Sequence, residues 1–251
     1  MDMELPFPEL STAPLTPGTL YLVATPIGNM EDITLRAIRT LRDCDLVAAE
    51  DTRHTGMLLK RLRLAKRQVS THKFNEAKRA GEIISLLEQG GTVALVSDAG
   101  SPGISDPGQR VVEAVFAAGL RVEPVPGACA LIAGLTASGL PTDEFHFFGF
   151  LPVKSAKRTR RLAKLLELSG TLVLYESPYR ITKLLGELAE LAPVREVVLA
   201  RELTKKFEQI QRGTAKELLE HYGEKKPKGE FVVLVGQALG SAGKQSVDEM
   251  D

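Results

Sequence analysis

Short apolar segments alternate with longer segments of helical periodicity over the first half of the chain. Four short segments have the length and composition of buried strands, namely Leu20–Ala24, Leu46–Ala49, Val93–Val96 and Arg121–Val125. The periodic segments predict helices at Thr34–Leu41, Thr55–Leu62, Glu76–Gln89, Gln109–Ala118 and Ala128–Ser138. A strand–helix alternation of this kind predicts a mostly parallel sheet that is covered by helices.

Predicted strands lie closer together in the second half. Phe145–Phe150 and Thr171–Tyr175 lie on either side of a basic helical segment, Ser155–Leu168. Further strands are predicted at Glu196–Ala200, Glu208–Gly213 and Glu230–Val235. Little helical sequence separates the first two of these, so they predict a hairpin and therefore a mixed sheet.

We therefore predict an α/β protein of two domains, residues 18–140 and 141–237, that share a ligand cleft. The boundary is expected within Ser138–Phe145, a segment that contains Gly and Pro. Residues 1–17 and 238–251 show no apolar periodicity and are expected to be mobile tails.

One predicted strand is followed by an unusually long turn segment. After Val93–Val96 the chain continues as Ser97-Asp98-Ala99-Gly100 and makes a second turn at Ser105–Pro107 before the next helix. Glycines let the main chain approach a ligand closely, and prolines fix turns. Because open α/β sheets bind ligands at the carboxyl ends of strands, we interpret this loop as part of a binding site rather than a plain connection.

Three other predicted strands also end in polar or small residues. Thr25–Asn29, Glu50–His54 and Pro126–Ala128 follow the first, second and fourth strands of the first half. If the sheet is parallel, all these loops emerge at one edge and line one pocket. Glu50 and Asp51 would supply hydrogen-bond acceptors or a base there, and a solvated turn is the alternative.

Several kinds of site are absent from the sequence. There is no GxxxxGK[ST] phosphate loop, no GxGxxG after the first strand and no GxSxG nucleophile turn. The four histidines lack paired ligand spacing, so no metal site is expected. Cys44 and Cys129 are isolated, which favours a reducing cytoplasm. No apolar run approaches the roughly 18 residues that cross a bilayer, so no membrane partner is expected.

Basic residues are clustered although the formal net charge is zero, with 32 basic and 32 acidic side chains. Arg53–Arg67 and Lys154–Lys164 contain many basic residues and no acidic residue, and Lys225–Lys228 is a smaller group. A solvated helix face explains one such cluster, but three favour a surface that contacts phosphates. On the second cluster the cations are expected on one helix face. The candidate RNA-binding residues are Arg53, His54, Lys60, Arg61, Lys154, Lys157, Arg158 and Arg161.

Motifs along the chain resemble a known family. In chain order they are GTLYLVATPIGNMEDITLRA, AAEDTRHTGMLL, ALVSDAGSPGISDPG, VEPVPGACA, GFLP, YESPYR and GEFVVLVG. Together they cover roughly residues 18–237 and resemble the small-subunit ribosomal RNA methyltransferase I family of the tetrapyrrole-methylase superfamily. Ser97-Asp98-Ala99 stands where tetrapyrrole enzymes carry Gly-Asp-Pro, a departure that fits the RNA branch.

The resemblance implies a two-domain tetrapyrrole-methylase-like fold with S-adenosylmethionine in the cleft between the domains. It also implies a cytoplasmic homodimer that methylates the ribose 2′-hydroxyl of a decoding-centre cytidine in the 16S rRNA of the small ribosomal subunit. The implied methyl-donor contacts are Pro26, Ser97, Asp98, Ala99, Gly100, Ile104, Ser105, Cys129, Ala130, Tyr175, Glu176, Arg201 and Glu230.

Methyl transfer from a sulfonium requires a hydroxyl that is aligned with the methyl group and relieved of its proton. The candidate bases are Glu50, Asp98 and Glu176, and the candidate stabilising cations are Arg201 and Lys205. Two alternatives stay open. One is a methyltransferase that acts on a tetrapyrrole, and the other is a non-catalytic module that binds the methyl donor and rRNA.

Overall fold

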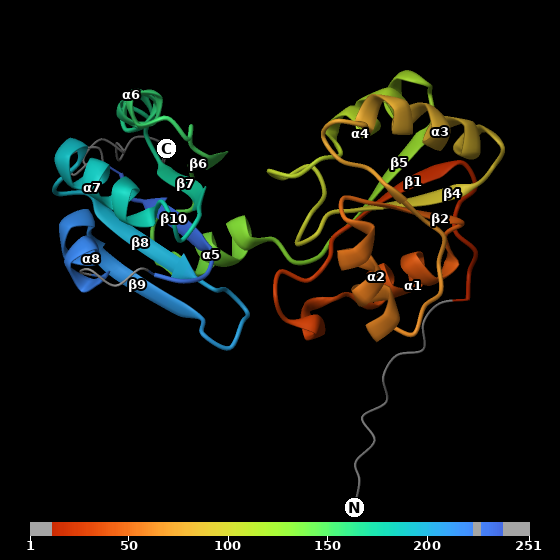
Figure 1. The fold of residues 1–251 in the computed structure, drawn as a ribbon, viewed down its shortest axis with the longest axis horizontal. Coiled ribbons are helices and arrows are strands. Elements are labelled where there is room, and N and C mark those ends of the chain that lie inside the picture. The colour runs from red at the N-terminus through yellow and green to blue at the C-terminus, as the bar shows by residue number, and fades with distance from the viewer. Residues whose placement is uncertain (1–11, 223–226, 238–251) are drawn as a thin grey trace, which may run out of the picture. The chain divides into compact units, whose positions relative to one another are not determined.

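A computed structural model of the chain describes residues 12–222 and 227–237. The chain divides into two compact units between Cys129 and Ala130, and each unit has its own sheet (Figure 1). The predicted tail 238–251 and the cations Lys225 and Lys226 lie outside the described residues.

The first unit contains a five-stranded sheet. Its strands are β1 (Thr19–Val23), β2 (Leu46–Ala49), β3 (Gln68–Ser70), β4 (Thr92–Val96) and β5 (Arg121–Val125), in the order β3-β2-β4-β1-β5. Every neighbouring pair is parallel. All residues of β2 and β4 are buried, as expected for central strands that are covered on both faces. The predicted parallel sheet is confirmed.

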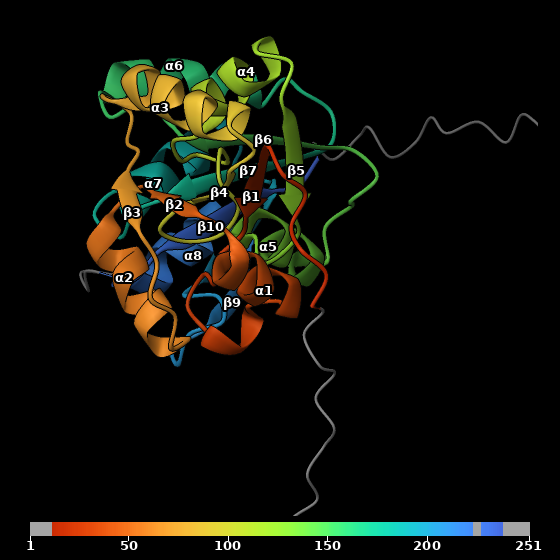
Figure 2. The ribbon, with the colours of Figure 1, turned by 90° about the vertical axis from the view of Figure 1, so that its right-hand side faces the viewer.

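Helices cover both faces of this sheet. Helices α1 (Leu35–Asp43) and α2 (Thr52–Arg61) lie on one face, whereas α3 (Glu76–Glu88) and α4 (Gln109–Ala117) lie side by side on the other (Figures 1 and 2). Alternate residues of the strands therefore join two apolar cores. Val47 and Ala94 pack toward α1 and α2, and Ala48 and Leu95 pack toward α3 and α4.

The order of the strands creates a topological switch point between β1 and β4. The chain leaves β1 toward β2 and leaves β4 toward β5, so these neighbouring strands send their connections in opposite directions. A short 3₁₀ helix, η1 (Met30–Asp32), lies on the connection after β1. Because all strands are parallel, the loops after β1, β2, β4 and β5 emerge at the same edge, as predicted. Such a switch point is where open α/β sheets bind ligands.

The second unit is built around a mixed sheet, as predicted. Its strands are β6 (Phe145–Phe150), β7 (Thr171–Glu176), β8 (Glu196–Arg201), β9 (Gln209–Thr214) and β10 (Phe231–Val235), in the order β6-β7-β10-β8-β9. Only the β6–β7 pair is parallel, and β8 and β9 form the expected hairpin.

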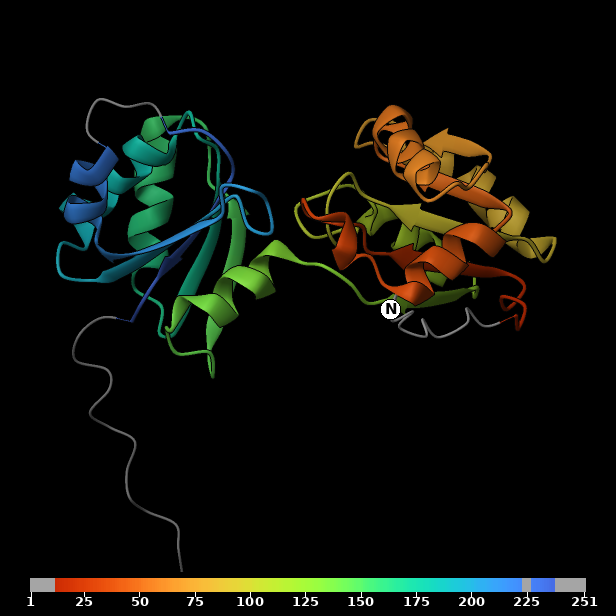
Figure 3. The ribbon, with the colours of Figure 1, turned by 90° about the horizontal axis from the view of Figure 1, so that it is seen from below.

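One large apolar core lies on one face of this second sheet. Helices α6 (Ser155–Leu165), α7 (Ile181–Leu191) and α8 (Ala215–Tyr222) supply leucines to it. Helix α5 (Ala130–Ser138) packs on the opposite face (Figure 3). A Cβ on its Gly134 would lie 3.0 Å from Cγ1 of Val232, so α5 approaches β10 closely.

The structure differs from the predicted organisation in three respects. The division falls before α5 rather than near residue 140, because α5 packs on the second sheet. Strand β3 and helices α7 and α8 were not predicted. Residues 12–17 of the expected N-terminal tail are partly held on the first unit, since Leu15 is buried in its core and the Thr16 N–H donates to the Tyr21 hydroxyl at 2.8 Å.

Candidate active site

The loops after β1 and β4 are tied together by their backbones. Thr25 and Gly100 exchange two hydrogen bonds, with N···O distances of 2.9 and 3.0 Å. The Thr25 hydroxyl donates to the Ser97 carbonyl at 3.2 Å, and the Ser97 hydroxyl donates to the Gly100 carbonyl at 3.1 Å. Both side chains are buried. The Ser97 hydroxyl, a predicted cofactor contact, is therefore used to hold the shape of the loop.

Small residues let three loops meet at this edge. Gly100 has a φ of +83°, and a Cβ there would lie 3.3 Å from Cγ2 of Ile27 and 3.5 Å from the Ala128 carbonyl oxygen. A Cβ on Gly127 would lie 2.9 Å from Cβ of Ala24. The loops after β1, β4 and β5 thus approach each other within the space of one methyl group. This is the close backbone approach that glycines allow at ligand sites.

The carboxylate of Asp98 lies beside Glu50 and Asp51, which are far from it in sequence, next to these loops. The Asp51 N–H donates to Oδ1 of Asp98 at 3.1 Å. Desolvation raises the pKa of Glu50, and the negative charges of Asp98 and Asp51 raise it further. A hydrogen bond from the Asp98 backbone and the nearby His72 lower it, but the net effect is a raised pKa. Glu50 is therefore a stronger base than an ordinary exposed glutamate.

His72 is a residue of this edge that the sequence did not identify. It follows β3, which pairs with β2, and the Thr71 N–H donates to the Ala49 carbonyl at 2.7 Å. This pairing sets the turn after β3 beside Glu50. Strand β3 has only three half-buried residues, so its apolar pattern was too short to reveal it.

The rest of the long loop after β4 is anchored to helix α3. The carboxylate of Glu76 is buried and accepts the Gly108 N–H at 2.6 Å. Ser105 has a φ of +66°. Between the loop and α4 is a cavity of about 220 Å³ that is lined mainly by Leu22, Leu95, Pro102, Ile104 and Val112.

The remaining cofactor candidates of the first unit are accessible to different degrees. Ile104, Ser105 and Ala99 are exposed, and Pro26 and Asp98 are half-buried. Cys129 and Ala130 are half-buried on either side of the division between the units.

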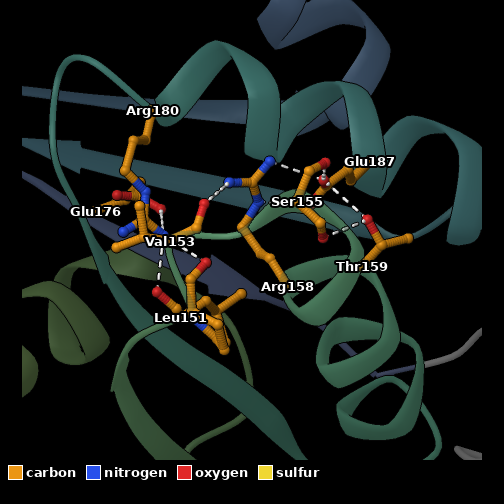
Figure 4. A network of polar contacts seen from close by, with 9 residues as sticks. Leu151, Val153, Ser155, Arg158, Thr159, Glu176, Arg180 and Glu187 are labelled. Atoms are coloured by element: carbon orange, nitrogen blue, oxygen red, sulfur yellow. Dashed lines mark hydrogen bonds and ion pairs between the residues drawn. The ribbon is translucent and has the colours of Figure 1, made fainter.

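Glu176, at the end of β7, is a buried member of a polar network (Figure 4). Its Oε1 accepts the Ser177 N–H at 2.7 Å, and its Oε2 lies 3.1 Å from Nη2 of Arg180. Burial raises the pKa of Glu176 more than these partners lower it. The neighbouring Tyr175 accepts the Leu131 N–H at its hydroxyl and packs its ring against Phe147.

The other candidate site residues of the second unit, Arg201, Lys205 and Glu230, lie in or beside the loop after β8. Nζ of Lys205 lies 3.0 Å from Oε1 of Glu202 and 2.9 Å from Oε2 of Glu230. Desolvation acts to lower the pKa of Lys205, but the hydrogen bonds with these two carboxylates outweigh it and raise the pKa. Arg201 donates from Nε to the Lys228 carbonyl. Glu202 was not among the candidate cofactor contacts, bases or stabilising cations, yet it organises this cluster.

Most of the predicted RNA-binding cations are exposed. Within the first basic cluster these are Arg53, His54, Lys60 and Arg61. Within the second they are Lys154, just before α6, and Lys157 and Arg161 on that helix. The predicted exposure of Arg158 is wrong. Its side chain is 4% exposed and forms a two-point ion pair with Glu187, with N···O distances of 2.8 Å (Figure 4). Arg158 therefore stabilises the second unit and is unavailable to RNA.

Among residues 12–222 and 227–237, no group of three or more His, Cys, Asp or Glu side chains could hold a metal ion. Within the same residues no helix is long and apolar enough to cross a membrane.

Comparison with known proteins identifies the class. A family model described as tetrapyrrole (corrin/porphyrin) methylases matches residues 19–219, and the chain therefore belongs to this family of methyltransferases. It is 49% identical over 222 residues to ribosomal RNA small subunit methyltransferase I of Synechocystis sp., covering 88% of this chain and 80% of that protein. The enzyme of the same name from Mesorhizobium japonicum is 48% identical over 236 residues, covering 93% and 80%. These relatives place the chain in the ribosomal RNA small subunit methyltransferase I group of the family.

Solved structures agree on the fold. The methyltransferase CobJ has a TM-score of 0.64 at 22% identity, covering 88% of this chain and 93% of that one. A uroporphyrin-III C-methyltransferase from Thermus thermophilus, solved with S-adenosyl homocysteine, has a TM-score of 0.60 at 22% identity, covering 88% and 98%. The predicted two-sheet architecture of the family is confirmed.

Proposed function

We propose that this chain transfers the methyl group of S-adenosylmethionine to the ribose 2′-hydroxyl of a decoding-centre cytidine in 16S rRNA. The observation that carries the proposal is the edge where small residues bring the loops after β1, β4 and β5 together, beside Glu50 and Asp98. The names of the relatives support the choice of small-subunit rRNA as the substrate. We further propose that the protein acts in the cytoplasm as a homodimer.

The residues of this edge fit S-adenosylmethionine chemically. Its apolar surfaces suit the lining of the cavity and the exposed Ile104. Its hydroxyl and amino groups suit the backbone at Ala99, which is exposed, and its positive sulfonium suits an edge rich in carboxylates. We propose that Pro26, Asp98, Ala99, Gly100, Ile104, Ser105 and Cys129 hold it. When bound, the cofactor supplies an activated methyl group.

Glu50 is the proposed base of the first unit. A ribose hydroxyl is a very weak acid, so its proton must leave as the new bond forms. Glu50 is half-buried, and its raised pKa makes its carboxylate a better acceptor of that proton than an ordinary glutamate. Asp98 is engaged by the Asp51 N–H, which suits it to positioning.

The candidate site residues of the second unit have different surroundings, and these favour different roles. Lys205 has a raised pKa and stays protonated, so it suits the stabilisation of negative charge. Glu176 is fully buried beside Arg180, and this surrounding favours a structural role over that of a base. We retain Tyr175, Arg201 and Glu230 as proposed cofactor contacts because their polar groups shape the ends of β7, β8 and β10.

The test is methyl transfer from labelled S-adenosylmethionine to small ribosomal subunits and to naked 16S rRNA. We expect label on one cytidine ribose, located by mass spectrometry of the digested RNA. Label that enters a tetrapyrrole instead, or cofactor binding without any transfer to RNA, would contradict the proposal.

Two variants separate binding from chemistry. Ala99→Leu places a bulky side chain on the exposed loop and should abolish cofactor binding in isothermal titration. Glu50→Gln should bind the cofactor normally but lower kcat by about 10²- to 10⁴-fold, the usual contribution of a general base. Glu113→Gln, an exposed glutamate on α4, is the matched control and should leave kcat unchanged.

A further inference from the structure

The turn after β3, residues 71–75, is rigidly built. The His72 N–H donates to Oδ1 of Asn75 at 2.8 Å, and the amide of Asn75 donates to the Ser70 carbonyl at 3.1 Å. The Asn75 N–H returns to the His72 carbonyl at 2.9 Å. The Asn75 side chain therefore closes the turn against the end of β3, so the residues at its tip have fixed directions.

Phe74 stands at the tip of this turn with its ring in solvent. It is 93% exposed, more than any other large hydrophobic residue among those described. Its N–H donates to Nδ1 of His72 at 3.3 Å, and the two rings meet edge to face with centroids 6.2 Å apart. Single exposed hydrophobic residues are common on proteins. An aromatic ring that an ordered turn displays beside a proposed active site needs a further explanation.

The charges around the 71–75 turn indicate what kind of partner would cover Phe74. Lys73 is exposed next to it, and the exposed Arg53 and His54 begin the helix that follows β2, the neighbouring strand. Close by, Glu50 and Asp98 carry negative charge. The cations attract phosphates, whereas the carboxylates repel them. A contact that does not depend on charge would therefore strengthen the binding of a nucleic-acid strand at this edge.

We propose that Phe74 stacks on an unpaired base of the rRNA substrate, while Lys73 and Arg53 contact its phosphates. This inference rests on the proposed function and adds a substrate-binding residue to it. Stacking on aromatic side chains is the common way in which proteins hold single-stranded RNA. The base is held by its neutral face, which leaves its ribose free to approach the carboxylates.

The chain contains no tryptophan, which permits a direct test. Phe74→Trp creates a protein with one tryptophan, and stacking on a base should quench its fluorescence when a synthetic single-stranded RNA with the decoding-centre sequence is added. Phe116→Trp, at a 62% exposed position on α4, is the matched control and should not respond. Both positions are exposed, so both variants should fold.

Kinetics give the second readout. Phe74→Ala should raise the KM for RNA by roughly 5- to 150-fold, the range measured for loss of one stacked base, with unchanged affinity for S-adenosylmethionine. Phe74→Tyr should restore the KM, because tyrosine stacks equally well.

The outcomes separate the inference from the proposed function. If the wild type methylates the RNA while Phe74→Trp shows no quenching or Phe74→Ala keeps its KM, the stacking contact is refuted and the proposed function stands. If the wild type does not methylate RNA but Phe74→Trp is quenched by it, the stacking contact is supported and the proposed reaction is refuted.

Discussion

Arg53 and Arg158 form ion pairs of the same length in opposite surroundings. Each guanidinium lies 2.8 Å from a carboxylate, that of Asp51 for Arg53 and that of Glu187 for Arg158. The Arg53 side chain is 90% exposed, whereas that of Arg158 is 4% exposed. Both residues were predicted to bind RNA from their place in basic clusters. Burial, and not the presence of a partner, separates the cation that can reach RNA from the one that holds the fold.

The carboxylates of the two pairs show the same contrast. Hydrogen bonds from Arg53 lower the pKa of Asp51 to about 2, but the Arg53 side chain is 90% exposed and that of Asp51 is 34% exposed. Desolvation would raise the pKa of Glu187, yet hydrogen bonds from Arg158, Thr159 and Ser155 outweigh it and keep the pKa below its ordinary value. Glu187 therefore depends on four neighbouring donor groups in the buried network of Figure 4.

The largest expected effect is the loss of stability on breaking the buried pair. Arg158→Ala should lower the free energy of unfolding by about 3 to 5 kcal/mol, because Glu187 is left as an uncompensated charge of low exposure. Urea denaturation of the full chain measures it. Arg160→Ala, exposed on the same helix, is the control and should stay within about 0.5 kcal/mol. Equal losses for the two variants would show that the pair is not structurally important.

Glu187→Gln should give a smaller effect that depends on pH. At pH 7 we expect a loss of about 2 kcal/mol, since a charged hydrogen-bond acceptor becomes neutral. The folded pKa of Glu187 is lowered, so its stabilisation is complete above the ordinary glutamate pKa and is lost as the pH falls through the folded value. Thermal unfolding from pH 7 to pH 3 should therefore show the gap between wild type and variant closing.

The exposed pair supplies the control for this titration. Asp51→Asn keeps a side chain that caps α2, and solvent screens the exposed pair, so its gap from the wild type at pH 7 should be smaller than that of Glu187→Gln and should close only as the pH falls toward the lowered pKa of Asp51. A gap that persists in acid for Glu187→Gln would mean that the amide disturbs packing rather than charge.

Arg53→Ala should have the smallest effect on the protein itself. We expect an unchanged Tm, because solvent screens the exposed pair. RNA affinity should fall by about 2- to 5-fold, and the slope of log K against log salt should decrease by about one, as for one lost phosphate contact. Arg110→Ala, on the exposed side of α4, should change neither quantity. An unchanged salt slope for Arg53→Ala would remove Arg53 from the RNA-binding surface.

Local pattern was enough to predict most of the fold. Strands β2, β5 and β6 have the predicted bounds, because apolar residues that are continuous in β2 and interrupted by polar residues in β5 and β6 mark each strand in the sequence. Parallel pairing followed from the helices between strands, and it correctly placed the loops after β1, β2, β4 and β5 at one edge. Helix α7 was missed although Ile181, Leu184, Leu185 and Leu188 have helical spacing and are buried.

Arg158 shows how a residue's role can be misread from charge alone. It was grouped with its basic neighbours on one helix face. It also shares the spacing of Leu162 and Leu165, which are buried with it on the face that packs toward the second sheet. That spacing was present in the sequence, but its partner Glu187 lies 29 residues away and is brought in only by α7.

The sequence by itself determined which segments become strands and helices, and which loops are rich in glycine and carboxylates, because these depend on neighbours along the chain. Only the tertiary structure decided which charges face solvent, which carboxylates share an edge, and that a three-residue strand places His72 and Phe74 beside them. Burial and pKa depend on atoms brought close in space. Asp51 and Asp98, 47 residues apart, meet only because β2 and β4 pair.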